Sequence, residues 1–208
     1  LRAMAERSAE AFGREYTFPH MVVFADRNGV EKEETFELSA AARDRFLFEI
    51  NVANPEQIEH RKALIFDSKF HDVDALLSDL SEPLLDYSEL NNLDRDVQQA
   101  VFVSDEIENY IIRIWDATWK PHEFGIEIPD VFMEDLVVAG ASVRGMSAMV
   151  RKVSAWLEGR DHVLPDDVHT ILFATLSHRV FLSPIYEGRR EQIMPLFIAA
   201  LRDHISAP

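Results

Sequence analysis

Cysteine is absent from this 208-residue sequence, which excludes disulfides and thiolate metal sites and is typical of a reducing compartment. Glycine and proline are scarce, at 7 and 9 residues, so collagen-like and low-complexity chains are excluded. No apolar run approaches the roughly 18 residues that a membrane span requires. We therefore expect a globular, cytoplasmic protein without a membrane span. The charged first residues carry no secretory signal, and we expect the natural protein to begin upstream of them.

Basic residues are also few, since 21 Lys and Arg stand against 37 Asp and Glu and give a formal net charge of −16. A protein so acidic repels phosphate backbones and anionic lipid surfaces. The charge therefore disfavours non-specific binding to nucleic acid or to a membrane.

Several chemical motifs are missing. The stretch "GASVRG" places its second glycine one residue too late for a nucleophile elbow. The stretch "DRNGVEKEETFE" places its glycine two positions too early for a calcium loop. The 8 histidines are scattered, so no metal site is predicted. No G-x-x-x-x-G-K-[ST] occurs, so these residues do not form a phosphate cradle of their own.

Mixed periodicity over the first 50 residues predicts part of an α/β layer, in which "MVVFAD" is an apolar run of the buried parallel-strand type. Ser39 is a candidate N-cap for a short helix. The elements expected here are a helix over 1–12 ended by Gly13, strands over 14–18 and 21–26, a helix over 39–46 and a strand over 47–52.

From Pro55 onward the pattern is helical. Ser104 is predicted to cap the clearest helix, whose apolar face comprises Ile107, Tyr110, Ile111, Ile114 and Trp115. The other predictions are a helix opening with Pro55 at its first position, two helices within 67–100, a loop over 120–140, a helix that Ser142 caps and Arg144 opens, one beginning at Pro165, and one over 189–204. We therefore expect an α+β to mostly α fold with domains at 1–54 and 55–208.

Three polar residues occupy positions that a binding site would use. Asn28 follows the apolar strand, at the edge where open α/β sheets bind ligands, although an Asn beside Gly29 is also typical of a turn. Arg45 precedes an apolar strand, and an ion pair with Asp44 or another carboxylate would explain it. Arg144 at a helix start opposes the macrodipole and therefore requires an anion nearby, either a carboxylate or a nucleotide phosphate.

The order of these segments resembles the C-terminal part of a MoxR-type AAA+ ATPase. "LRAMAER", "GREYTFP", "VVFADRNG", "VEKEETFEL" and "AARDRFLFEI" are similar to the stretch after the Walker B strand of that family. "VSDEIENYIIRIWDATW", "GASVRG", "EGRDHVLPDDV" and "LSHRV" are similar to its helical lid. The resemblance implies a remnant of the AAA+ α/β nucleotide-binding layer followed by an all-helical lid bundle with a C-terminal helical tail.

The resemblance also implies roles for the three residues. Asn28 corresponds to sensor 1, which orients the attacking water. Arg45 corresponds to the arginine finger of "DRF", which acts on the nucleotide of a neighbouring subunit, and Arg144 corresponds to the sensor 2 arginine, which reaches the γ-phosphate. Such cations stabilise the negative charge that develops in phosphoryl transfer.

The resemblance implies that the intact protein binds ATP and Mg²⁺ and forms a homo-oligomeric ring, a hexamer, that couples ATP hydrolysis to chaperone-like remodelling or maturation of client proteins. Its clients would include proteins with von Willebrand factor A domains. This chain alone, without Walker motifs, is expected to bind no cofactor. Gly29, Ala40 and Val143 depart from the family pattern of Pro, Glu and Pro. Two alternatives stay open: a non-hydrolysing interaction module derived from the same fold, and an unrelated acidic helical binding protein.

Overall fold

The computed structural model describes residues 7–20, 22–26, 38–80 and 85–208. The chain divides into two compact units, of which the first comprises residues 1–49 and 91–208 and the second residues 50–90. The first unit holds residues from both sides of the predicted boundary at 54/55, and that boundary stays a prediction. The described fold is mostly helical with two small two-stranded sheets, in agreement with the expected class.

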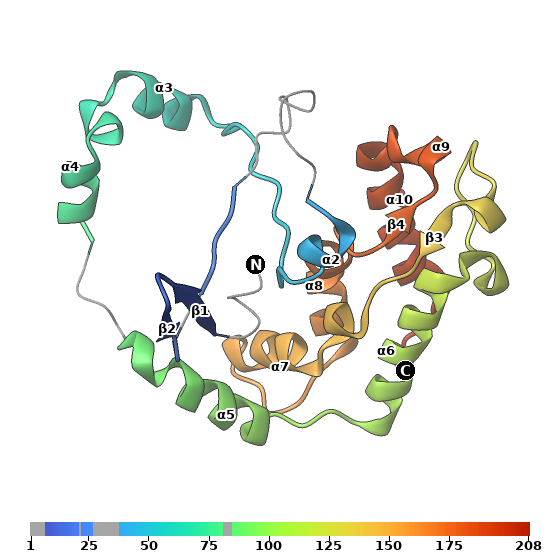
Figure 1. Cartoon of the computed structure of the whole chain (residues 1–208). Helices are drawn as coiled ribbons and strands as arrows, with labels where there is room; N and C mark the ends of the chain where they lie inside the picture. Colours follow the sequence, from blue (N-terminus) through green and yellow to red (C-terminus); the bar gives the residue numbers. More distant parts are fainter. Residues whose placement is uncertain (1–6, 21, 27–37, 81–84) are drawn as a thin grey trace. The chain divides into compact units, whose positions relative to one another are not determined.

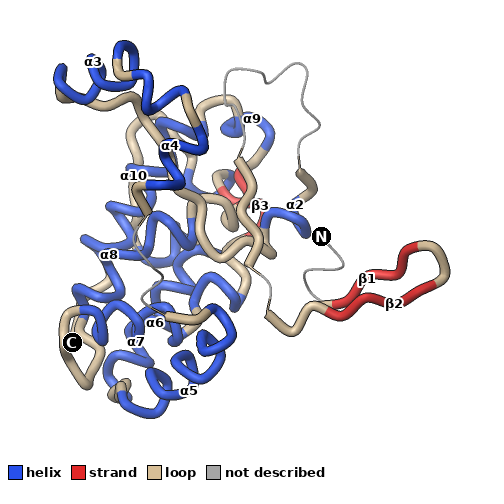
Figure 2. Tube along the Cα trace, turned by 90° about the vertical axis from the view of Figure 1, so that its left-hand side faces the viewer, coloured by secondary structure: helices blue, strands red, loops and turns tan. Residues whose placement is uncertain are grey.

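Residues 8–17 form a hairpin (Figure 2), so the helix predicted over 1–12 is wrong for residues 8–12, while residues 1–6 lie outside the described residues. Strand β1 (Ser8–Ala11) pairs antiparallel with β2 (Arg14–Thr17), which confirms the predicted strand of "REYTF". Phe12 and Gly13 make the turn with φ of 54° and 71°. Two consecutive positive φ angles are what a type I′ hairpin requires, so Gly13 ends a strand here and not a helix.

The prediction that "VVFAD" forms a buried strand was wrong for this chain. Residues 22–26 are exposed and form no strand, and Phe24 is 92% exposed. A strand of the parallel type needs neighbours on both sides, and the described residues supply none for it. Asn28, predicted to follow this strand, lies outside the described residues. The strand predicted over 47–52 is likewise absent, since these residues have no regular secondary structure.

The second unit consists of short helices with exposed apolar side chains. Its helices are α3 (Ile58–Phe66) and α4 (Val73–Ser78), and neither contains a buried residue. Pro55 lies before α3, so it is not the first residue of that helix as predicted. With α5 (Leu90–Ala100), α4 accounts for the two helices expected within 67–100.

The core lies within residues 97–205 of the first unit. Helix α8 (Pro165–Leu176) lies against α7 (Ala148–Leu157) and α10 (Arg190–His204), and α10 lies against α6 (Asp105–Trp119) (Figure 1). Two strands, β3 (Val137–Ala139) and β4 (Phe181–Leu182), pair antiparallel within this bundle. The bundle therefore differs from the all-helical bundle that the resemblance implies. Among the described helices, none combines the length and apolar character of a membrane span. Helix α9 (Pro184–Glu187) lies between β4 and α10 in the sequence.

The predicted signals of α6 and α8 are confirmed. Ser104 Oγ accepts a hydrogen bond from the Ile107 N–H at 3.3 Å, as an N-cap should. The predicted apolar face of α6 is buried except for Trp115, which is partly buried. Pro165 is the first residue of α8. Local sequence therefore determines both helices.

A buried carboxylate holds α7, α8 and the loop between them together. Asp167 is 2% exposed and accepts hydrogen bonds from Arg160 at 2.6 and 2.7 Å, from Ser154 Oγ at 2.9 Å and from the Leu164 N–H at 2.8 Å. Burial raises the pKa of this carboxyl, but the hydrogen bonds outweigh that effect and leave the pKa below its usual value. The folded state is therefore stabilised by the ionised form.

Asp167→Asn is expected to lower the free energy of unfolding at pH 7 by about 3 kcal/mol, because it removes one partner of a buried pair. Asp166→Asn, on the exposed side of the same helical turn, should cost less than about 1 kcal/mol. The contribution of Asp167 is fully present above the usual aspartate pKa of about 3.9 and is lost as the pH falls through the lower folded-state value. Urea unfolding at pH 7 and at steps below pH 4 checks both points. Equal losses for the two variants would contradict the role of Asp167.

Candidate functional site

Arg144 lies in a 3₁₀ turn, η5 (Val143–Met146), and not in the first turn of α7 as predicted. Ser147 adopts φ −52° and ψ 125°, which interrupts the helix, and α7 begins one residue later. The expected conflict between Arg144 and a helix macrodipole therefore does not arise. Ser142 is the N-cap residue of η5, but its side chain makes no capping bond there.

Glycines allow this turn to approach its neighbours closely. A Cβ at Gly145 would lie 3.0 Å from Cδ of Arg179 and 3.2 Å from a methyl of Leu176. A Cβ at Gly140 would lie 2.5 Å from the indole of Trp119. The two glycines of "GASVRG" thus permit the contacts between the η5 region, α6 and the end of α8.

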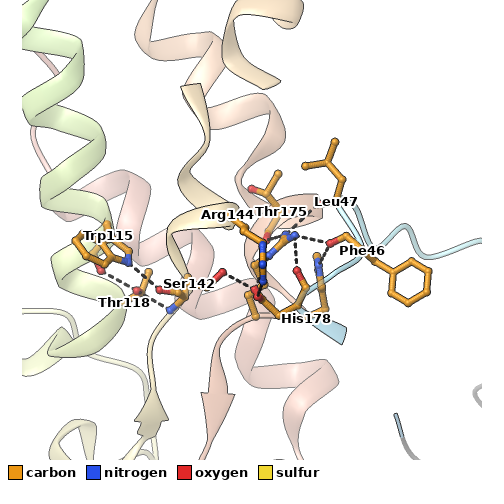
Figure 3. A network of polar contacts seen from close by, with 12 residues as sticks. Phe46, Leu47, Trp115, Thr118, Ser142, Arg144, Thr175 and His178 are labelled. Carbon is orange, nitrogen blue, oxygen red and sulfur yellow. Dashed lines mark hydrogen bonds and ion pairs between the residues drawn. The ribbon is translucent and has the colours of Figure 1, made fainter. Parts of the chain in front are cut away.

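The residue between the glycines that anchors the stretch is Ala141. Its carbonyl accepts hydrogen bonds from the indole N–H groups of Trp115 at 2.7 Å and Trp119 at 3.1 Å. Its N–H donates to Thr118 Oγ1 at 3.0 Å. These three bonds to α6, of which Figure 3 labels Trp115 and Thr118, fix the chain directly before Ser142 and Arg144.

Asp44 is the anion that Arg144 contacts. One carboxylate oxygen accepts a hydrogen bond from Arg144 at 2.7 Å. The other accepts a short hydrogen bond from Ser142 Oγ and one from Nε of Arg179 at 3.2 Å. Burial raises the pKa of the Asp44 carboxyl, but the hydrogen bonds from Ser142 and Arg144 and the positive charges of Arg179 and Arg144 outweigh it, and the pKa lies below its usual value. Asp44 is therefore held ionised.

Arg179 is the residue of this site that sequence reasoning missed. Its side chain is 1% exposed and its guanidinium donates to the carbonyl oxygens of Asp44 at 3.2 Å, Leu47 at 2.9 Å and Thr175 at 2.6 Å, and by a short bond to that of Phe46. It follows α8 in "LSHRV", a segment of the resemblance in which the sequence pattern does not single out the arginine. The available signal was an arginine directly before the apolar stretch "VFL", because a cation that is buried there requires partners.

The neighbouring His178 supports the same segment. Its Nε2 donates to the Phe46 carbonyl at 2.9 Å (Figure 3). Burial is the main reason that the pKa of His178 lies below its usual value. Farther along, the Glu49 N–H donates to the Ala174 carbonyl at 2.9 Å. The segment 44–49 is thereby attached to the end of α8 through its backbone.

A second buried arginine lies behind the η5 turn. Arg151 of α7 donates to the Ser147 carbonyl at 2.8 Å and, more weakly, to that of Gly145 at 3.5 Å. Burial lowers the pKa of Arg151 to about 10. Within the described part of the chain no carboxylate pairs with it, so its contribution is to hold the carbonyl groups of the turn.

Arg45 and Arg144 line one open pocket of about 440 Å³ together with Leu47, Val143, Ser147 and Arg179. The Arg45 side chain is exposed, and among the described residues it forms no hydrogen bond or ion pair. Asp44, the alternative partner suggested for Arg45, pairs with Arg144 and Arg179 instead. The structure thus brings together two of the three predicted residues, and the third, Asn28, lies outside the residues described.

Arg179→Met is expected to lower the free energy of unfolding by about 3–5 kcal/mol, because it leaves Asp44 and several carbonyl groups without their buried donor. Arg144→Met is the matched control: the Arg144 side chain is 62% exposed, and an exposed ion pair contributes at most about 1 kcal/mol. Urea unfolding of both variants at pH 7 measures the difference. A larger loss for Arg144→Met would show that the buried arginine is not the main link between Asp44 and α8.

The chain is similar in sequence to known proteins. The family model for the AAA lid domain matches residues 133–195, which include Arg144 and Arg179. Protein MoxR of Methylorubrum extorquens is 47% identical over 210 residues, covering 100% of this chain and 61% of that protein. Chaperone MoxR1 of Mycobacterium tuberculosis is 32% identical over 199 residues, covering 94% of this chain and 49% of that protein.

A solved structure is similar over the whole chain. The structure of a putative ATPase from Cytophaga hutchinsonii matches with a TM-score of 0.78 at 23% identity, covering 100% of this chain and 60% of that one. At this identity the match establishes the fold alone. The chain spans about three fifths of the length of Protein MoxR. It belongs to the MoxR family of AAA+ ATPases and carries the part that includes the AAA lid domain.

Proposed function

We propose that the intact protein hydrolyses ATP and couples this reaction to chaperone-like remodelling or maturation of client proteins. The observation that carries the proposal is that Arg45 and Arg144 both line an open pocket, so both residues are accessible to a nucleotide, whether their own subunit or a neighbour binds it. Arginine suits this role because it stays charged and presents a planar fork of donors to phosphate. The chaperone role is supported by the name of the similar MoxR1 protein.

The residues of this chain account for only part of a nucleotide site. The exposed guanidinium groups of Arg45 and Arg144 suit the phosphate groups of ATP, which supplies the γ-phosphoryl group that is transferred. Among the described residues, no group of three or more His, Asp or Glu side chains could hold a metal ion. P-loop ATPases hold Mg²⁺ with the phosphate-loop Ser or Thr and the Walker B Asp, and we propose that the rest of the intact protein supplies these ligands. The 208 residues likewise contain no phosphate loop.

Each of the three residues is assigned a role that follows from the family. Asn28 orients the attacking water, and Arg144 stabilises negative charge on the phosphate bound by its own subunit. Arg45 acts on the nucleotide of the neighbouring subunit in a ring, where a cationic finger contributes about 10³–10⁵ in rate. The ring, a hexamer in our proposal, would act on client proteins that carry von Willebrand factor A domains.

A second candidate is a non-hydrolysing interaction module that keeps the fold. It is favoured by one observation, namely that Arg144 already has an anionic partner in Asp44 at 2.7 Å. If that pair were permanent, Arg144 would not be available to a phosphate. ATPase activity of the intact protein separates the two candidates.

This chain alone should not bind ATP measurably. Without a phosphate loop, two arginines cannot provide the backbone N–H cradle that holds the α- and β-phosphates. Calorimetric titration with ATP and Mg²⁺ is expected to show no binding heat up to millimolar concentrations. Micromolar binding would overturn the assignment of the missing cradle to the rest of the protein.

Mixed rings test the separate roles of Arg45 and Arg144. In the intact protein, Arg45→Ala should lower ATP turnover by about 10³–10⁵, equivalent to roughly 4–7 kcal/mol in barrier. Arg189→Ala, which removes an exposed arginine outside the pocket, is the control and should leave turnover unchanged. Mixing Arg45→Ala subunits with subunits whose phosphate loop is broken should restore activity, because an intact finger then faces an intact site.

Mixing Arg144→Ala subunits with the same partner should restore nothing, because each subunit's own site stays defective. If Arg45→Ala turns over ATP normally, its role as a finger is excluded. If neither mixture recovers although both single variants are inactive, Arg45 and Arg144 act on the same nucleotide, as their shared pocket would also allow.

A further inference from the structure

Asp44 shares its single carboxylate between two arginines whose surroundings differ. The Arg144 side chain is 62% exposed, whereas that of Arg179 is 1% exposed, and Asp44 itself is 16% exposed. The two guanidinium groups bind different oxygens, so each bond can break while the other persists.

The cost of breaking the two bonds is unequal. An exposed ion pair contributes little to stability, since both charges are readily solvated. Removing Arg179 would instead leave one buried and two partly buried carbonyl groups, and a partly buried carboxylate, without their donor. Release of Arg144 still leaves Asp44 with a cation and with the Ser142 hydroxyl as donors.

We propose that Asp44 is a positioning residue that binds Arg144 until a nucleotide phosphate displaces it, while Arg179 keeps the Asp44 charge paired. This inference rests on the proposed role of Arg144 at the nucleotide. The pocket beside the pair provides the space for the exchange, because Arg144 and Arg179 both line it. Asp44 therefore competes with the nucleotide for Arg144 and lowers the affinity of the site for the nucleotide.

Ser142 and the glycines keep the turn in place during this exchange. The Ser142 hydroxyl binds the same carboxylate oxygen as Arg179, not the one that Arg144 occupies. Gly145 keeps the turn close to Arg179. The backbone of η5 is thus fixed independently of the Arg144 side chain, and only that side chain needs to move.

Equilibrium binding to the intact protein tests the exchange, with Mg²⁺ and a non-hydrolysable ATP analogue as the probe. Asp44→Asn keeps the shape and removes the competing charge, so the Kd should fall by up to about fivefold, which corresponds to about 1 kcal/mol for an exposed pair. Asp166→Asn removes a carboxylate elsewhere on the lid and should leave the Kd unchanged. A Kd that is unchanged or higher in Asp44→Asn overturns the proposal.

A double-mutant cycle separates competition for Arg144 from a general loss of negative charge. The gain from Asp44→Asn should disappear when Arg144→Ala is also present. A gain that persists there would show ordinary electrostatic repulsion and overturn the exchange. If Arg144→Ala alone leaves the Kd and turnover unchanged, the proposed function of Arg144 fails instead, which is a separate result.

Folding of the variants needs its own control, since Asp44→Asn leaves Arg179 without its carboxylate. Urea unfolding of Asp44→Asn, measured under the conditions of the titration, gives the fraction of folded protein. A loss of folded protein would lower the number of binding sites but not the Kd. If Asp44 has only a structural role, the Kd of Asp44→Asn is therefore unchanged, and that result overturns the proposal.

Discussion

The buried contact of Arg179 with residues 44–47 is the interaction on which the candidate site depends. One side chain neutralises Asp44 and satisfies the carbonyl groups of a segment that has no regular secondary structure. The N–H groups of residues 44–46 donate to carbonyl groups of residues 40–43. The carbonyl groups of Asp44, Phe46 and Leu47 need other donors, and buried polar groups without partners are costly. The arginine supplies the donors that a neighbouring strand would otherwise provide, and it thereby positions Arg45.

The same contact gives Asp44 two functions that depend on solvent exposure. On the side of Arg179 the carboxylate faces the protein interior, and breaking this pair would lower the stability of the fold because it leaves a buried charge without a partner. Toward Arg144 it is part of the surface, where water screens the pair and competing anions can enter. A difference in exposure between two guanidinium groups is therefore enough to separate a structural arginine from one that is available for a ligand.

The described residues comprise a packed lid and segments whose apolar side chains are exposed. Residues 97–205 form the hydrophobic core, whereas 22–26 and the helices α3 and α4 expose apolar side chains. The chain covers 61% of Protein MoxR. An α/β layer is stable only when its strands are paired and covered on both faces. The helical lid needs its apolar faces covered, and residues 97–205 cover them among themselves.

The sequence by itself determined the helices whose signals are local. Ser104 with the apolar face of α6, and Pro165 with the acidic turn of α8, lie within a few residues of the structure they specify. The order of the "DRF" and "GASVRG" segments also indicated the family and selected Arg45 and Arg144. Tertiary structure decided the rest: that residues 22–26 form no strand, where α7 starts, the burial of Arg179 and the choice of Asp44 as the partner of Arg144. The last two depend on contacts between residues 100 and 135 positions apart, and neither periodicity nor spacing along a chain records which distant groups meet.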